Sequence, residues 1–151
     1  MAKDFSVLFS EPSDESVAIT LTTPDTIFKE TFLTCLYPTI EQLCHGLSDS
    51  CAGREAGRVV FFLEPAELDL VIKQSSAGRV LLTIDLYYDH RRYIEARRHR
   101  VFEYEGPCLA IAMEFWRALR KLQLLCPSAV PERALASLRR AINDLEGPKA
   151  G

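Results

Sequence analysis

The chain has 151 residues, of which 48% are hydrophobic and 26% are charged, a globular composition that excludes disordered and fibrous classes. This length is sufficient for one hydrophobic core, and we expect a single domain over residues 1–151. The formal net charge of −3 argues against a nucleic-acid binder, which usually carries a basic balance, so we expect no nucleic-acid partner.

Residues 1–5 lead directly into a β-rich run, without the roughly 7–15 apolar residues of a secretory signal. No apolar run approaches the roughly 20 residues that span a bilayer. We therefore expect a cytoplasmic protein with no membrane partner. The five cysteines are an odd number and show no Cys-x-x-Cys spacing, which favours reduced and mostly buried thiols.

Seven β-rich runs, most of them bounded by Pro, Gly or polar clusters, predict strands. The first two runs are separated by a polar loop and predict a hairpin. The runs are residues 4–9, 17–22, 27–35, 58–63, 67–74, 79–88 and 93–104.

A short helix is expected between the third and fourth runs. Thr39-x-x-Gln42, directly after Pro38, has the form of a capping box, in which the two side chains satisfy early amides of the helix. The polar cluster at residues 48–50 is expected to end this helix.

The fifth and sixth runs alternate so clearly that their register can be predicted. If both apolar sets face one core, a three-residue loop at 76–78 with Gly78 in the left-handed conformation satisfies the pairing. This register places Asp69 directly opposite Asp85 on the outward face. Like charges in that position destabilise a strand pair.

The seventh run has an ambiguous register. Phe102 and Tyr104 share one side of the strand, but the same alternation brings Arg98 and Arg100 to that side too. Either a β-bulge redirects the middle of the strand, or the turn end of this hairpin extends beyond the helix that covers the sheet.

Two helices are predicted at the C-terminal end, over residues 106–126 and 131–146. The first has two apolar rows, so it must be buried, and the preceding strands are expected to cover it. We therefore predict an α+β fold: a mainly antiparallel sheet of about six to seven strands with helices packed on one face, two of them C-terminal. The opposite face is expected to be exposed to solvent.

The outward carboxylates Glu67, Asp69 and Asp85 admit three interpretations. They could form a solvated strand face neutralised by Arg97 or Lys73, or an acidic docking surface. They could also hold a divalent cation or act in acid/base catalysis, but a catalytic metal site would need further ligands that the sequence does not place. We expect no metal and no cofactor.

Residues 90–100 form the densest charge run of the chain, with arginines interleaved with an aromatic residue. Such a run suits RNA or phosphate, but neighbouring carboxylates and the negative net charge favour a solvated hairpin arm or contact with an acidic patch on a partner.

The order of features from about residue 59 to 125 resembles the small immunity proteins of bacterial polymorphic-toxin systems, in particular the WapI-type immunity families. The resemblance is carried by residues 61–64, 67–74, the Gly78 hairpin into 80–86, residues 101–104, and the helix that contains Phe115-Trp116. It implies a non-catalytic cytoplasmic protein that binds and neutralises one cognate toxin. It carries over no functional residue, because such families share a scaffold rather than a site motif.

Our first hypothesis is therefore an immunity-type protein that binds a toxin domain with its exposed sheet face. The expected partner-binding residues are Glu67, Asp69, Asp85, Tyr87 and Arg97. Tyr87 is included because tyrosine is frequent at binding hot spots. The alternative is an effector-binding chaperone or adaptor with an apolar patch on the sheet, and a small hydrolase is a third hypothesis. The oligomeric state is left open.

Overall fold

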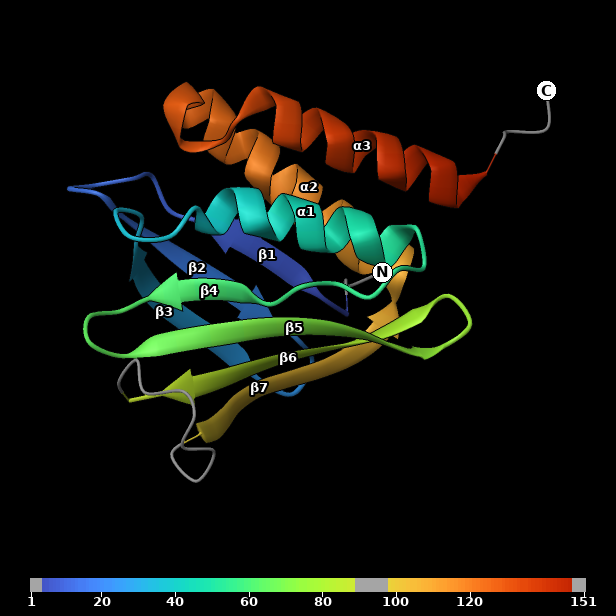
Figure 1. Ribbon diagram of the computed structural model, residues 1–151, viewed down its shortest axis with the longest axis horizontal. Helices are drawn as coiled ribbons and strands as arrows, with labels where there is room; N and C mark the ends of the chain where they lie inside the picture. The colour runs from blue at the N-terminus through green and yellow to red at the C-terminus, as the bar shows by residue number, and fades with distance from the viewer. Residues whose placement is uncertain (1–3, 89–97, 148–151) are drawn as a thin grey trace.

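The fold is one open antiparallel sheet with three helices, seen in a computed structural model that describes residues 4–88 and 98–147. Each strand pairs with the next along the chain, so the sheet order is the sequence order (Figure 1). This confirms the predicted α+β class, with two of the helices C-terminal. The strands are β1 (Ser6–Phe9), β2 (Ser16–Thr22), β3 (Ile27–Leu33), β4 (Val59–Phe62), β5 (Glu67–Ser76), β6 (Arg79–Tyr87) and β7 (Arg98–Pro107). The helices are α1 (Thr39–Cys51), α2 (Cys108–Leu125) and α3 (Glu132–Glu146), with a short 3-10 turn, η2 (Pro127–Ala129).

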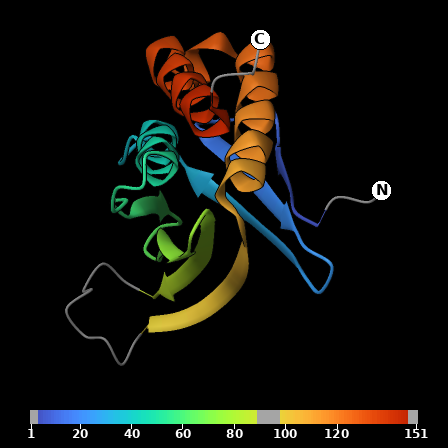
Figure 2. The ribbon, with the colours of Figure 1, turned by 90° about the vertical axis from the view of Figure 1, so that its right-hand side faces the viewer.

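The sheet is strongly curled around its core. The Phe28 ring on β3 lies 5.9 Å from the Phe102 ring on β7, and Phe5, just before β1, stacks on Tyr104 of β7 at 5.1 Å. Side chains of β7 therefore contact one side chain of β3 and one just before β1. Figure 2 shows the curled ribbon of the sheet below the helices. The helices cover the open side of this curl, and the buried hydrophobic residues form one core cluster.

Helix α2 has two apolar rows of side chains. The sheet packs against one row, and α3 packs against the other. Phe115 and Leu119 are fully buried. On the second row, the guanidinium carbon of Arg139 on α3 lies 4.8 Å above the centre of the Trp116 ring, and Arg139 also contacts the sulfur of Met113. The strands are therefore only part of the cover, because α3, α1 and η2 also contact α2.

The joint between β3 and β4 is nearly open, with Leu33 opposite Phe62 as its one paired position. Helix α1 begins beside this joint. The Leu63 N–H donates to the Ala66 carbonyl, on the side of β5. Because successive residues of a strand direct their backbone groups to opposite neighbours, the N–H and C=O of Val60 point towards β3. These two groups need partners that β3 does not provide there.

The predicted capping box is wrong, because the two side chains bond to β4 instead. Pro38 is the N-cap residue of α1, without a side-chain capping bond. The Thr39 hydroxyl donates to the Val60 carbonyl at 2.6 Å, and the Val60 N–H donates to the Gln42 side-chain oxygen at 3.0 Å. The two side chains replace a neighbouring strand, and they tie the helix to the sheet.

Helix α1 also continues beyond its predicted end at residues 48–50, up to Cys51. The Ser48 hydroxyl donates to the Cys44 carbonyl one turn earlier at 2.7 Å, so this serine is satisfied within the helix. None of the five cysteines is in a disulfide, and Cys44, Cys51 and Cys108 are buried.

The hairpin of β5 and β6 has the predicted even register, with Leu70 opposite Ile84 and Asp69 opposite Asp85. The expected three-residue loop is wrong in detail. Ser76 pairs with Arg79, and the extra residue is a bulge at Ser75. Gly78 has a φ of +72°, the left-handed conformation that glycine adopts without strain.

We expect Thr39→Val to lower the free energy of unfolding by about 1–3 kcal/mol, because the buried Val60 carbonyl loses its donor at nearly constant side-chain volume. Urea unfolding followed by circular dichroism measures the change. Thr31→Val is the matched control, because Thr31 is exposed on β3 and should change stability by less than about 0.5 kcal/mol. Equal effects for the two variants would contradict the bridging role of Thr39.

In the native protein, iodoacetamide should modify Cys35 first and Cys126 next, because Cys35 is exposed and Cys126 is half-buried. Burial raises the pKa of Cys44 to about 12, so its reactive thiolate is scarce at neutral pH. Mass spectrometry of the intact and digested protein measures the order of modification. Modification of Cys44 as fast as Cys35 under native conditions would contradict this packing.

Candidate functional site

The candidate site is the outer face of β5, β6 and β7, which is turned away from the core. Leu68 and Leu70 of β5 point into the core, so alternation places Glu67 and Asp69 on the outer face. Asp85 on β6 lies directly opposite Asp69. The structure thus brings the predicted aspartates together on one face of the sheet.

The prediction that these carboxylates are exposed to solvent is wrong. The exposed fraction is 1% for Glu67, 4% for Asp69 and 5% for Asp85. Thr83, two residues before Asp85 on β6, is buried as well. The outer face is therefore covered at its centre, and the cover consists of long side chains from neighbouring strands.

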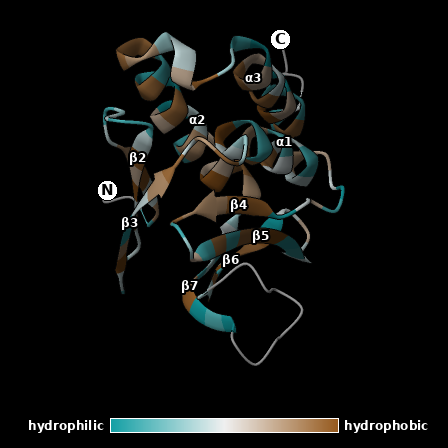
Figure 3. Ribbon diagram, turned by 60° about the vertical axis from the view of Figure 1, so that its left-hand side comes forward, coloured by the Kyte–Doolittle hydropathy of each residue, from teal (hydrophilic) through white to brown (hydrophobic). Residues whose placement is uncertain are grey.

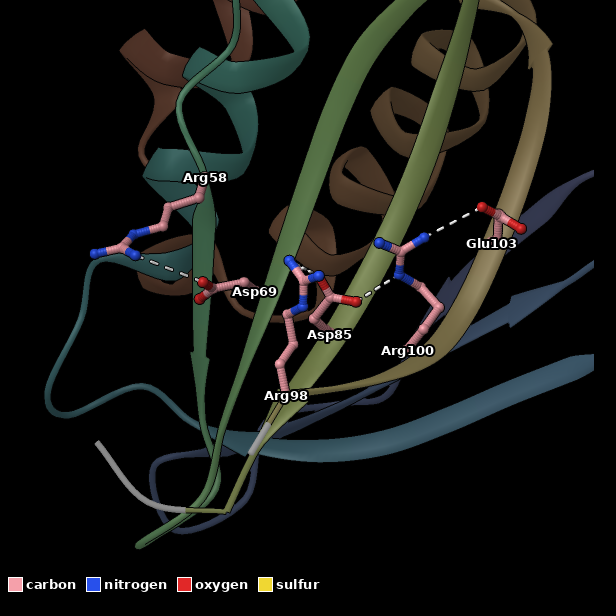
Figure 4. A network of polar contacts seen from close by, with 6 residues as sticks. All are labelled: Arg58, Asp69, Asp85, Arg98, Arg100 and Glu103. Atoms are coloured by element: carbon pink, nitrogen blue, oxygen red, sulfur yellow. Dashed lines mark hydrogen bonds and ion pairs between the residues drawn. The ribbon is translucent and has the colours of Figure 1, made fainter. Parts of the chain in front are cut away.

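Three arginines form this cover, which we call the arginine cluster: Arg58, Arg98 and Arg100. Arg58, just before β4, places Nη1 3.6 Å from Asp69 Oδ2. Arg100 on β7 places Nε 2.5 Å from Asp85 Oδ1 and Nη1 3.2 Å from Glu103. Arg98 Nη1 lies 3.9 Å from the other Asp85 oxygen (Figure 4).

A β-bulge at Val101 makes the cluster possible. Ile84 pairs with Phe102, but the next residue, Asp85, pairs with Arg100, so β7 has one extra residue at this point. Phe102 stays in the core while Arg100 and Arg98 turn to the outer face beside Asp85. This confirms the bulge as the correct solution to the ambiguous register of the seventh strand.

The accessible part of the site is basic, although its centre is acidic. The exposed fraction of the arginine side chains is 58% for Arg58, 41% for Arg98 and 43% for Arg100, against 5–7% for the two aspartate side chains. The hydrogen bond from Arg100 to Asp85 raises the pKa of Arg100 above its ordinary value, so this guanidinium keeps its charge. The start of β7 is accordingly hydrophilic in Figure 3.

Two further predicted residues, Glu67 and Tyr87, lie at the margin of this site. Glu67 accepts a hydrogen bond from the Tyr37 hydroxyl at 2.5 Å, so its carboxylate is engaged by the loop that precedes α1. Tyr87 is half-buried opposite Glu67. Arg97 lies outside the described residues.

Sequence reasoning missed Arg58 and Arg100 as partners of the aspartates. The signal for Arg58 is its position two residues before Val60, which pairs with Asp69, so Arg58 is on the same face. Arg100 could be placed only once the position of the bulge was known.

The site has the geometry of a contact surface. A shallow hollow of about 170 Å³ lies over Asp69 and Asp85, between Lys73, Tyr87 and the arginines of β7. This is smaller than the roughly 300–1,000 Å³ of a typical small-molecule site. Forked guanidinium groups at its rim can donate paired hydrogen bonds to a carboxylate.

Residues 4–88 and 98–147 contain neither a grouped set of metal ligands nor a membrane-spanning helix. Within these residues, no three or more His, Cys, Asp or Glu side chains are grouped as a metal site would require. No helix in this part of the chain has the length and apolar character needed to cross a bilayer.

We expect Arg100→Met to destabilise the protein by about 2 kcal/mol, because it leaves the buried Asp85 carboxylate with a weaker partner, and the half-exposed arginine limits the loss. The double variant Asp85→Leu with Arg100→Met should recover most of this loss, because the buried carboxylate that has lost Arg100 is removed as well. Urea unfolding measures both.

Arg54→Met is the control for this experiment, since Arg54 and Asp49 form an exposed pair at 3.1 Å. Its effect should stay within about 0–1 kcal/mol. A loss of the same size for Arg54→Met and Arg100→Met would contradict the special role of the buried carboxylate.

Comparison with known proteins yields no match at the level of family, sequence or structure. No protein-family model fits the chain, and no curated protein and no solved structure is significantly similar to it. The function is therefore argued from the arginine cluster and from the surface around it.

Proposed function

We propose that this protein is an immunity-type protein that binds and neutralises a bacterial toxin domain through the outer face of β5, β6 and β7. The observation that carries the proposal is the arginine cluster held over two buried, facing aspartates. In this proposal the protein acts by covering a surface of the toxin, without catalysis.

Stability alone is a poor reason for such an arrangement. Taking charges out of water is costly, and apolar residues of similar size often stabilise a fold as well as a buried ion pair does. Asp69 and Asp85 have the further disadvantage that they face each other directly. A surface that must present arginines in fixed positions is a better explanation.

Fixed arginines favour recognition. A free arginine loses rotamer freedom when a partner binds, whereas the hydrogen bonds of Arg100 to Asp85 and Glu103 hold it in place beforehand. Arginine and tyrosine are enriched in interfaces, and Tyr87 lies at the edge of the same hollow. The facing surface of the toxin is therefore expected to be acidic. The sequence had instead suggested an acidic docking surface on this protein.

This face supports the two other hypotheses less well. An effector chaperone would need an apolar patch, but Lys73, Arg98 and Arg100 are exposed here. A hydrolase would need carboxylates free to exchange protons with a substrate, whereas Asp85 is engaged by two arginines.

The ligand for the test is the product of a toxin gene, to be sought beside the gene of this protein. Lys73→Glu combined with Arg98→Gln changes the charge of the face but leaves in place Arg58, which contacts Asp69, and Arg100, which contacts Asp85. We expect an affinity loss of about tenfold or more by calorimetry and loss of growth protection when the toxin is coexpressed.

The matched control is Lys29→Glu combined with Arg133→Gln, which makes the same charge change at exposed positions on β3 and α3. It should bind like the unmodified protein. If the two double variants bind equally well, or if the unmodified protein does not bind the toxin, the proposal is wrong.

A further inference from the structure

Strand β1 is an edge of the sheet, and part of its backbone is directed outwards. The Ser10 N–H bonds to the Ala18 carbonyl, and hydrogen-bonding positions alternate along an antiparallel pair. Ser6 and Leu8 therefore direct their backbone groups to β2, and Val7 and Phe9 direct theirs to the open side. An edge of this kind can accept a further strand.

A groove of about 500 Å³ runs between this edge and α2. Ser6, Val7 and Leu8 form the strand side, and Trp116, Arg120 and Lys121 are on the helix side. An extended segment in this groove could bond to Val7 and Phe9 while its alternate side chains contact the helix. Leu8, whose exposed fraction is 60%, adds an apolar contact at the rim.

The helix side of the groove is basic. Arg117, Arg120 and Lys121 are exposed. Among the described residues that line the groove, Glu114 is the one acidic residue. It is largely buried and accepts a hydrogen bond from Arg117 at 3.0 Å, so it offers little repulsion to an anion. The Trp116 ring is fixed by Arg139 stacked above it and gives the groove a rigid wall.

We propose that the groove between β1 and α2 binds an extended, acidic segment of a partner protein, which adds to β1 as an antiparallel strand. The backbone of the segment supplies the pairing, and its carboxylates contact Arg117, Arg120 and Lys121. This site is separate from the outer face of β5, β6 and β7, because the groove and the hollow over Asp69 and Asp85 share no lining residue.

The test is a selection of displayed random peptides on the full-length protein. The selected peptides are synthesised, and their dissociation constants are measured by fluorescence anisotropy. We expect them to be rich in Asp and Glu. Two N-methylated versions of a peptide are compared, one methylated at odd and one at even positions. One version should lose binding and the other should keep it, because a strand pairs with a single neighbour through every second N–H.

Two variants locate the binding. Val7→Pro removes an outward N–H without removing a bond to β2, and Arg120→Glu with Lys121→Glu reverses the charge of the groove. Each should raise the dissociation constant about tenfold or more. Arg133→Glu with Arg140→Glu makes the same charge change on the exposed surface of α3 and should have no effect.

Thermal unfolding reports whether each variant is folded. If Val7→Pro does not fold, the N-methylated peptides alone test whether the segment pairs with the backbone of β1. The proposal is overturned if no peptides are enriched or if they lack acidic residues. It is also overturned if both groove variants bind the peptides as tightly as the unmodified protein does. A dimer of the peptide-free protein that dissociates on Val7→Pro would instead assign the edge to a second copy of the chain.

Discussion

Two aspartates face each other across β5 and β6, and the arrangement of the outer face follows from this pairing. The core requires it, because Leu70 and Ile84 must both point inwards from the neighbouring positions. A shift by one residue would relieve the repulsion but would turn the whole apolar set to the outside. The charges therefore have to be balanced from adjoining segments, and Arg58 and Arg100 do so from opposite sides.

Strand β7 must supply one side chain to the core and two to the arginine cluster on the outer face. A regular strand cannot place Phe102 in the core and Arg100 beside Asp85, since both residues would then point to the same side. The bulge at Val101 removes this conflict at the cost of one unpaired residue, whose side chain is exposed. The gap between β3 and β4 is closed in another way. There the side chains of Thr39 and Gln42 bond to the backbone of Val60.

Much of the fold was predictable because it depends on local periodicity. The alternation in β5 and β6 was enough to predict their register, and the apolar rows of α2 and α3 predicted those helices closely. The roles of Thr39 and Gln42 were not predictable, because their partner, Val60, belongs to a later strand. The burial of Asp69 and Asp85 was missed for a similar reason: alternation assigns a side chain to a face, and exposure depends on which distant residues lie over it.

The same reasoning explains why the sign of the surface differs from the sign of the residues at its centre. A buried carboxylate attracts long cationic side chains whose stems cover it and whose charged ends reach towards solvent. A partner approaching β5, β6 and β7 therefore contacts guanidinium groups of Arg58, Arg98 and Arg100 before it reaches any aspartate. Because the aspartates hold those groups in position, a change at Asp85 would affect recognition indirectly, through the geometry of the arginines.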